Sequence, residues 1–324
     1  MKPNGILLGL VLALAAGGCV TDTEYREERA IDLDRNSDFD GTKLRLYLTL
    51  EEDGRLVSVN TEDDAIGTSP SPTPIPRHTA RRWTFEKDRG EEGFTIAHAV
   101  VSWDPDNPAD YLLAGWWSEF PADAESVWDG ERWRLVDGPE LDHGVTPEIP
   151  IAGMASYVGP AGGLYLYVPG SDWGEDEGKF VIEEYQGTIN IAADFQDGTL
   201  KGCIGCVGDL VTTRAHFGVF LGAELLDVQE TARDYELHLG TAIIRPDWDG
   251  QFHRDRVTLQ HPTRDITLSD GFWGGAVSSK QDADGNPRVI GGFNSVYFEE
   301  GDGSIGRIDG SFMAPSETFA ASEN

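Results

Sequence analysis

The feature that most constrains the fold is a succession of short alternating runs between Ile151 and Phe312. The run 187–195, Gly-Thr-Ile-Asn-Ile-Ala-Ala-Asp-Phe, places an apolar residue at alternate positions, as a strand with one buried face does. Turn-forming pairs such as Asp197-Gly198 and Asp302-Gly303 separate the runs. Many short antiparallel strands at close spacing favour a barrel or sandwich. We expect strands at 151–157, 163–168, 179–186, 188–195, 199–203, 235–244, 257–260, 271–278, 288–298 and 304–312.

The first part of the chain also predicts β structure. Lys43–Glu51 alternates polar and apolar residues, and Asp53-Gly54 forms a hairpin turn into 55–60. Residues 67–76 carry four prolines and read as an extended loop. Further strands are expected at 81–87, 94–103 and 111–120. We therefore expect an all-β protein, with a β-rich region over 41–148, the strand-dense region over 149–316 and a tail over 317–324.

The N-terminus resembles that of an exported lipoprotein. Residues 6–16 form an uncharged run of eleven residues, too short for a membrane span of about 20 residues. Lys2 before the run and Ala16-Gly17-Gly18 after it are typical of a signal peptide over 1–18. The next residue, Cys19, completes a lipobox-like motif, which predicts acylation of Cys19 and a polar tether over 19–40. The alternative is an ordinary signal peptide with an incidental cysteine.

The charge of the chain excludes one class of partner. The formal net charge is −32. Nucleic-acid binding needs a basic face, so we expect no nucleic-acid partner. The acidity is explained either by a saline habitat, which we favour, or by steering of cationic ligands.

Cys203 and Cys206 form a C-x-x-C motif at the end of a predicted strand. Export implies an oxidising compartment, which favours a local structural disulfide. Free thiols, redox chemistry and metal binding are the alternatives. A thioredoxin-like site needs a helix that starts at the motif, and a zinc site needs a second ligand pair, which the sequence does not reveal.

No motif in the sequence predicts catalysis. The seven histidines stand outside nucleophile and zinc-protease motifs, so we expect no catalytic residue, cofactor or metal site. Asp282–Pro287 is similar to the start of a calcium loop, but its glycine is misplaced, and a hairpin turn is favoured. Trp173 in the acidic run 172–177 is a weak ligand-binding candidate, with a solvated turn as the alternative.

Four segments resemble the transferrin-binding protein B family of surface lipoproteins. Gly153–Tyr165 resembles the opening barrel strand, Tyr185–Gly202 the consecutive strands that end in a Gly-Thr-x-x-Gly element, and Gly306–Pro315 the closing strand. Asp110–Trp117 resembles a strand ahead of the barrel in single-lobe relatives. The resemblance implies a small β handle domain followed by an eight-stranded antiparallel β-barrel, with lipid-anchored display at the outer membrane. The closing motif departs from the family pattern.

These features together predict a non-catalytic ligand-binding lipoprotein, displayed at the cell surface by lipid on Cys19. Its ligand would be a protein or a nutrient or metal carrier. The alternative is an accessory envelope lipoprotein that partners an outer-membrane transporter. The ligand-binding loops of the family are variable, so no ligand-contacting residue is carried over from it.

Overall fold

The computed structural model describes residues 147–170, 181–213 and 230–322, and, in the part before them, the strands between Glu27 and His143. Nearly all elements described are antiparallel strands, so the predicted all-β class is confirmed. The predicted tail begins with the short helix α2 (Glu317–Ser322). Among the described residues, no helix combines the length and the apolar character that a membrane span requires.

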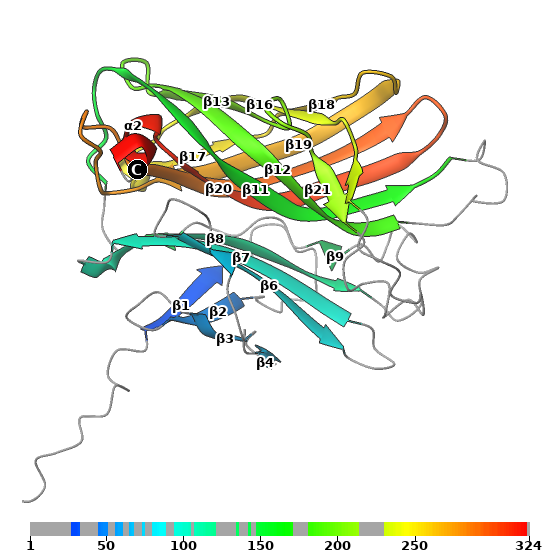
Figure 1. Cartoon of the computed structure of the whole chain (residues 1–324), viewed down its shortest axis with the longest axis horizontal. Coiled ribbons are helices and arrows are strands. Elements are labelled where there is room, and N and C mark those ends of the chain that lie inside the picture. Colours follow the sequence, from blue (N-terminus) through cyan, green and yellow to red (C-terminus); the bar gives the residue numbers. More distant parts are fainter. Residues whose placement is uncertain are drawn as a thin grey trace, which may run out of the picture.

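The strands before residue 147 form two antiparallel sheets (Figure 1). One sheet has the order β1-β2-β3-β4, and the other has the order β10-β8-β7-β6-β5 with β9 beside β8. Their division into a separate handle domain stays a prediction. The strands are β1 (Glu27–Asp32), β2 (Arg45–Leu50), β3 (Leu56–Asn60), β4 (Ala65–Gly67), β5 (Thr73–Pro74), β6 (Ala80–Asp88), β7 (Phe94–Asp104), β8 (Asn107–Phe120), β9 (Arg134–Leu135) and β10 (Asp142–His143).

The remaining strands form one curled sheet of order β17-β19-β20-β21-β11-β12-β13-β16-β18, with β14 and β15 beside β12. The curl gives a half-barrel (Figure 1). The strands are β11 (Met154–Val168), β12 (Val181–Asp194), β13 (Thr199–Ile204), β14 (Val211–Thr213), β15 (Glu230–Ala232), β16 (Glu236–Ile243), β17 (Gln251–Arg254), β18 (Val257–Gln260), β19 (Ile266–Val277), β20 (Val289–Glu300) and β21 (Ile305–Pro315), and the 3-10 helix η5 (Pro246–Trp248) precedes β17.

The two edge strands of this sheet, β17 and β18, are consecutive in the sequence. β17 pairs with β19 and β18 pairs with β16, and only Asp255 and Arg256 separate β17 from β18. The Ser269 hydroxyl on β19 accepts a bond from the Leu259 N–H and donates to the Val257 carbonyl, at 2.8 and 3.1 Å. A side chain thus bonds β18 to β19 where no strand ladder joins them.

Two pairs of predicted strands are single strands in the structure. The predicted runs 151–157 and 163–168 fall in β11, which begins only at Met154, and 179–186 and 188–195 lie mostly in β12. Pro160 does not break β11 because it remains paired with Thr188 of β12, while the β21 ladder begins one residue later, at Ala161. Gly187 likewise stays in register with Ala161.

The inward positions of the curled sheet form one apolar core. Its largest fully buried side chains include Trp273, Phe298 and Phe312, which come from β19, β20 and β21. Burying each aromatic side chain stabilises the fold by about 1.5–3 kcal/mol. A second cluster lies outside this core, where Leu112 of β8 packs with Val289 and Met313. The outward faces of β12, β13, β16 and β18 remain available for a surface site.

Candidate functional site

A groove lies across the outer face of the four adjacent strands β12, β13, β16 and β18. The register places Asn190, Cys203, His238 and Thr258 opposite one another in one row across these strands. Asn190, His238 and Thr258 each lie between buried neighbours, such as Ile189 and Ile191 around Asn190, and Cys203 precedes the buried Ile204. The pleat therefore sends all four side chains outward.

Small residues beside this row make the face concave. Ala192 and Gly240 lie among longer side chains, and Gly240 lies so close to Arg256 that a Cβ atom there would be 3.0 Å from the Arg256 Cβ. The resulting space, here called the outer groove, has a volume of about 490 Å³. It is lined by Asn190, Ala192, Lys201, Gly202, Cys203, His238, Leu239, Gly240, Thr241, Arg254, Arg256 and Thr258.

The charges of the outer groove are of one sign. Lys201, Arg254 and Arg256 line it, all three are exposed, and no carboxylate is among the lining residues. None of the three cations has an ion-pair partner among the described residues. Two nearby carboxylates contact histidines instead: Glu236 of β16 lies 3.0 Å from His238, and Asp255, between β17 and β18, lies 2.6 Å from His253.

Four other described arginines are matched by carboxylates. The pairs are Arg233–Glu183, Arg245–Asp247, Arg264–Glu300 and Arg307–Asp309. The chain has 57 acidic and 25 basic residues, so carboxylates are in excess and most cations could form an ion pair. Three unpaired cations gathered in one groove therefore make a local anion-attracting surface on an otherwise acidic protein.

The predicted cysteine pair lies at one corner of the groove. The structure joins Cys203 and Cys206 by a disulfide, with their Cα atoms 5.8 Å apart. Gly205 between them has φ +86°, a backbone conformation that favours glycine. No helix starts at the motif, which ends β13, so the arrangement differs from a thioredoxin-like site.

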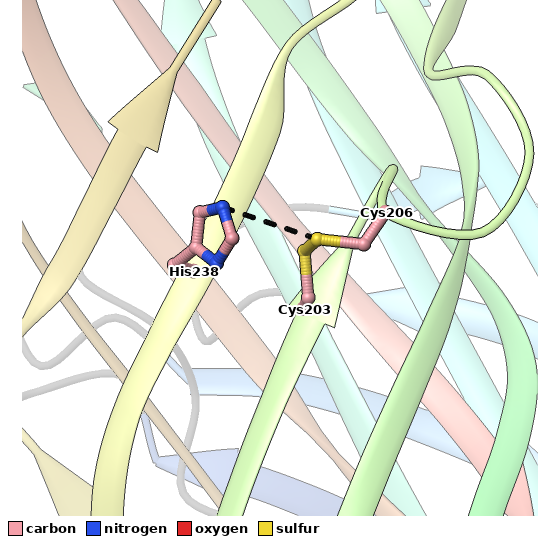
Figure 2. Close-up of side chains that lie close together, drawn as sticks. All are labelled: Cys203, Cys206 and His238. Atoms are coloured by element: carbon pink, nitrogen blue, oxygen red, sulfur yellow. Dashed lines mark hydrogen bonds between the residues drawn. A yellow bond between two sulfur atoms is a disulfide. The ribbon is translucent and has the colours of Figure 1, made fainter.

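His238 approaches this disulfide from the neighbouring strand (Figure 2). Its Nε2 atom lies 4.0 Å from the Cys206 Sγ atom and 3.0 Å from the Glu236 Oε2 atom. The ligand atoms of Cys203, Cys206 and His238 all lie within 4.8 Å of one another. The sequence did not reveal this cluster, because His238 lies 32 positions from Cys206 and only the β13–β16 register brings them together.

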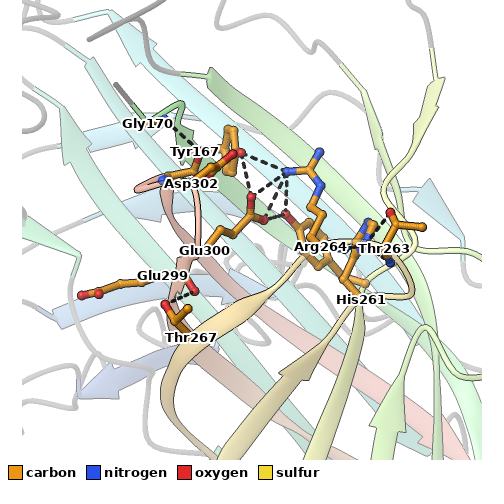
Figure 3. Close-up of polar contacts among 11 residues, drawn as sticks. Tyr167, Gly170, His261, Thr263, Arg264, Thr267, Glu299, Glu300 and Asp302 are labelled. Atoms are coloured by element: carbon orange, nitrogen blue, oxygen red, sulfur yellow. Dashed lines mark hydrogen bonds and ion pairs between the residues drawn. The ribbon is translucent and has the colours of Figure 1, made fainter. Parts of the chain in front are cut away.

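A second polar cluster lies at the end of the sheet where β11 and β20 finish (Figure 3). It is here called the Glu300 cluster. The Glu300 carboxylate accepts hydrogen bonds from the Tyr167 and Tyr235 hydroxyls, at 3.0 and 2.7 Å, and forms an ion pair with Arg264 at 3.1 Å. Burial raises the pKa of Tyr167 to about 12 and also raises that of Tyr235. This cluster is internally satisfied, so we assign it a structural role.

His261 sits against the Glu300 cluster as a neutral ring. Its ring packs edge-on to Tyr235, and its Nδ1 atom accepts bonds from the Thr263 and Arg264 N–H groups at 3.1 and 3.0 Å. Burial, followed by the Arg264 charge, lowers the pKa of His261 below its ordinary value. The ring therefore orders the turn before β19 as an acceptor rather than as a cation.

The loop that resembles a calcium site is a turn. The Asp282 Oδ1 atom accepts hydrogen bonds from the Asp284 and Asn286 N–H groups, both at 2.9 Å, and its Oδ2 atom accepts one from the Ser316 hydroxyl. Its oxygens are thus used within the protein, as predicted for a hairpin. Cys19 and Trp173, the other two predicted site residues, lie outside the described residues.

Comparison of the sequence with protein-family models and with curated proteins gives no match.

Proposed function

We propose that this protein is a non-catalytic binding module that captures an anionic ligand in the outer groove. The observation that carries the proposal is the gathering of Lys201, Arg254 and Arg256 around one space of about 490 Å³, with no carboxylate partner among the residues that the structure describes. A space of that size holds a small molecule or one side-chain cluster of a protein ligand. The proposal narrows the predicted ligand class to molecules that present carboxylate or phosphate groups.

The chemistry of the three cations suits recognition. The planar guanidinium groups of Arg254 and Arg256 can each donate two parallel hydrogen bonds to a carboxylate or phosphate. Lys201 adds a point charge, and Thr241 and Thr258 add hydroxyls at the edge of the groove. An acidic protein surface around a basic groove would repel most anions and concentrate those that fit at this one place.

The predicted membrane attachment would present this groove outward. Acylation of Cys19 and the tether over 19–40 would hold the sheet at the outer membrane, as the resemblance to transferrin-binding protein B implies. Protease treatment of intact cells tests this display, with a Cys19→Ser variant beside the wild type. Digestion of the wild type, and release of the variant from the membrane, would support it. Protection until lysis would contradict it.

Ligand capture is tested by calorimetric titration of the mature chain with three anionic probes: citrate, inorganic phosphate and a polyglutamate peptide. We expect at least one probe to bind, more weakly as salt rises. Arg254→Gln/Arg256→Gln should weaken that binding at least tenfold, because each charged hydrogen bond contributes about 1.5–3 kcal/mol. Arg245→Gln is the matched control, since Arg245 is an exposed arginine already paired with Asp247. Failure of all three probes, or equal binding by the double variant, would contradict the proposal.

A second candidate is the accessory role beside an outer-membrane transporter. Exposed apolar side chains favour it: Ile151, Met154, Ile243 and Trp248 are 91%, 78%, 60% and 48% exposed. They lie at the end of the sheet where β11 begins and β16 ends. Loss of co-purification with a single transporter in an Ile151→Ser/Met154→Ser variant, and retention in Arg254→Gln/Arg256→Gln, would favour this role over ligand capture.

A further inference from the structure

We propose that the corner of the outer groove at Cys203 is a redox-controlled zinc site. After reduction of the Cys203–Cys206 disulfide, the two thiolates, the His238 imidazole and the Glu236 carboxylate would bind one Zn²⁺ ion. The proposal does not depend on the capture of an anionic ligand. It rests on the convergence of Cys203, Cys206 and His238, whose ligand atoms all lie within 4.8 Å of one another, and on Glu236, which contacts His238 at 3.0 Å.

The backbone places Cys203, Cys206, Glu236 and His238 on the same part of the outer face of β13 and β16. Glu236 and His238 are two positions apart on β16, so both side chains lie on the same outward face. Cys203 is the direct cross-strand partner of His238. The turn at Gly205 returns Cys206 to the same place. A C-x-x-C pair joined by His and Glu from the next strand supplies four ligands of the types that zinc binds in proteins.

The distances are close to those of a tetrahedral site. With bonds of about 2.3 Å to sulfur, 2.0 Å to nitrogen and 2.1 Å to oxygen, a tetrahedron sets the N···S separation at about 3.5 Å and the N···O separation at about 3.4 Å. The observed separations from the His238 Nε2 atom are 4.0 Å to Cys206 Sγ and 3.0 Å to Glu236 Oε2. The two sulfur atoms, which the disulfide joins, would have to separate to about 3.8 Å, so both cysteine side chains would rotate after reduction to admit the ion.

The orientation of His238 favours a metal over a catalytic relay. In a nucleophile–histidine–carboxylate relay, the nucleophile and the carboxylate bind different ring nitrogens. Here both Cys206 Sγ and Glu236 Oε2 face the same atom, Nε2. A sulfur and a carboxylate on the same ring nitrogen cannot relay a proton through the ring. They are placed as ligands of one shared cation would be.

The charges of the surroundings also fit the ion. Two thiolates and one carboxylate bring three negative charges to a divalent cation, which leaves the site with a net charge of about −1. Lys201, Arg254 and Arg256 line the same groove and offset that excess. His238 is partly exposed, at 39%, so zinc reaches the site from solvent.

The reaction is balanced with a dithiol as reductant. Thiol–disulfide exchange transfers two electrons to the Cys203–Cys206 bond, giving two thiols and leaving the reductant as its disulfide. Zinc then displaces the two thiol protons to solvent, and His238 binds as the neutral ring. Reoxidation would expel the ion and restore the bridge.

The test measures zinc binding by the mature chain carrying Cys19→Ser, so that no third thiol competes. Zinc is titrated in competition with a chromophoric chelator, before and after reduction with a dithiol that is then removed. We expect one ion per reduced chain, bound at least 100-fold more tightly than by the oxidised chain. Cobalt should give a thiolate charge-transfer band and the intense visible bands of a tetrahedral ion.

Variants separate this site from adventitious binding. Loss of an outer-shell partner alone weakens metal binding about 10- to 100-fold, so His238→Ala and Glu236→Gln, which each remove a direct ligand, should weaken zinc binding at least about tenfold. His253→Ala is the matched control, since His253 also lies beside a carboxylate, Asp255, but near no cysteine in the described structure; its affinity should not change. Equal affinity in His238→Ala and wild type would overturn the proposal. So would a reduced chain that binds no zinc, or that loses its β-sheet circular dichroism on reduction, because no folded site would then exist.

Discussion

The Glu300 cluster and the outer groove differ in whether their cationic side chains are paired with carboxylates. In the cluster, Arg264 is 27% exposed and its guanidinium faces a carboxylate and two hydroxyls, so its charge is neutralised within the fold. In the groove, Lys201, Arg254 and Arg256 are exposed and have no such partners within the described part of the chain. A buried unpaired charge would destabilise the fold, whereas an exposed one is solvated at little cost. The first arrangement therefore stabilises structure, and the second remains available to a ligand.

Removing the centre of the Glu300 cluster should have the largest effect on stability. Glu300→Ala deprives Arg264, Tyr167 and Tyr235 of their shared acceptor, and breaking a buried ion pair in this way costs about 3–5 kcal/mol. We expect that loss in the free energy of unfolding by urea, followed by tryptophan fluorescence. Asp247→Ala removes a carboxylate from an exposed pair and should leave the transition unchanged. Equal midpoints for the two variants would show that the cluster does not stabilise the fold.

Alkaline pH should weaken the same cluster. Burial raises the pKa of Tyr167 from 10.0 to about 12, so the folded protein holds the phenolic proton more tightly than the unfolded chain. This contribution to stability is complete below about pH 10 and is lost as pH rises toward 12. Urea unfolding between pH 8 and pH 12 should show the decline, and Tyr167→Phe should make it shallower. An identical slope in the variant would assign the decline to other groups.

The hydrogen bonds of Ser269 that join β18 to β19, here called the seam, should contribute less to stability than the Glu300 cluster does. Ser269→Ala removes the hydroxyl that bonds both the Leu259 N–H and the Val257 carbonyl, and leaves them without that partner. An unsatisfied backbone group costs about 1–3 kcal/mol when buried. Hydrogen exchange at Leu259 should accelerate accordingly. Ser278→Ala, which alters a turn rather than the seam, should leave that amide unchanged.

The sequence predicted the class of fold but not the length of its strands. Alternation along 187–195 identified a strand because every second residue had to be buried. Glycine and proline suggested breaks at Gly187 and Pro160 that the structure does not contain, because cross-strand pairing continues through both positions. Local conformational preference was overridden by the ladder with a neighbour distant in the sequence. β17 was not predicted, because its four residues carry one buried side chain, Phe252.

The candidate site was predicted only in part. The spacing of Cys203 and Cys206 indicated a local bridge, since three positions allow one directly. Glu236, His238, Arg254 and Arg256 were not singled out as a site, although Glu-x-His spacing places Glu236 and His238 on one face of β16 and the two arginines are only two positions apart. What the sequence does not specify is the register of β16 against β13 and β18, and that register brings the two pairs beside the cysteines.

The cations of the outer groove should contribute almost nothing to stability. This smallest expected effect tests most directly whether the groove differs from the Glu300 cluster. Arg254→Gln/Arg256→Gln removes two exposed cations that form no ion pair with any described residue, so the free energy of unfolding should change by less than about 0.5 kcal/mol. Urea unfolding measures this on the same samples used for anion titration. If the double variant unfolds as easily as Glu300→Ala, the groove cations are structural and ligand capture loses its support. If stability is unchanged while anion binding falls tenfold, these cations serve recognition and the fold does not depend on them.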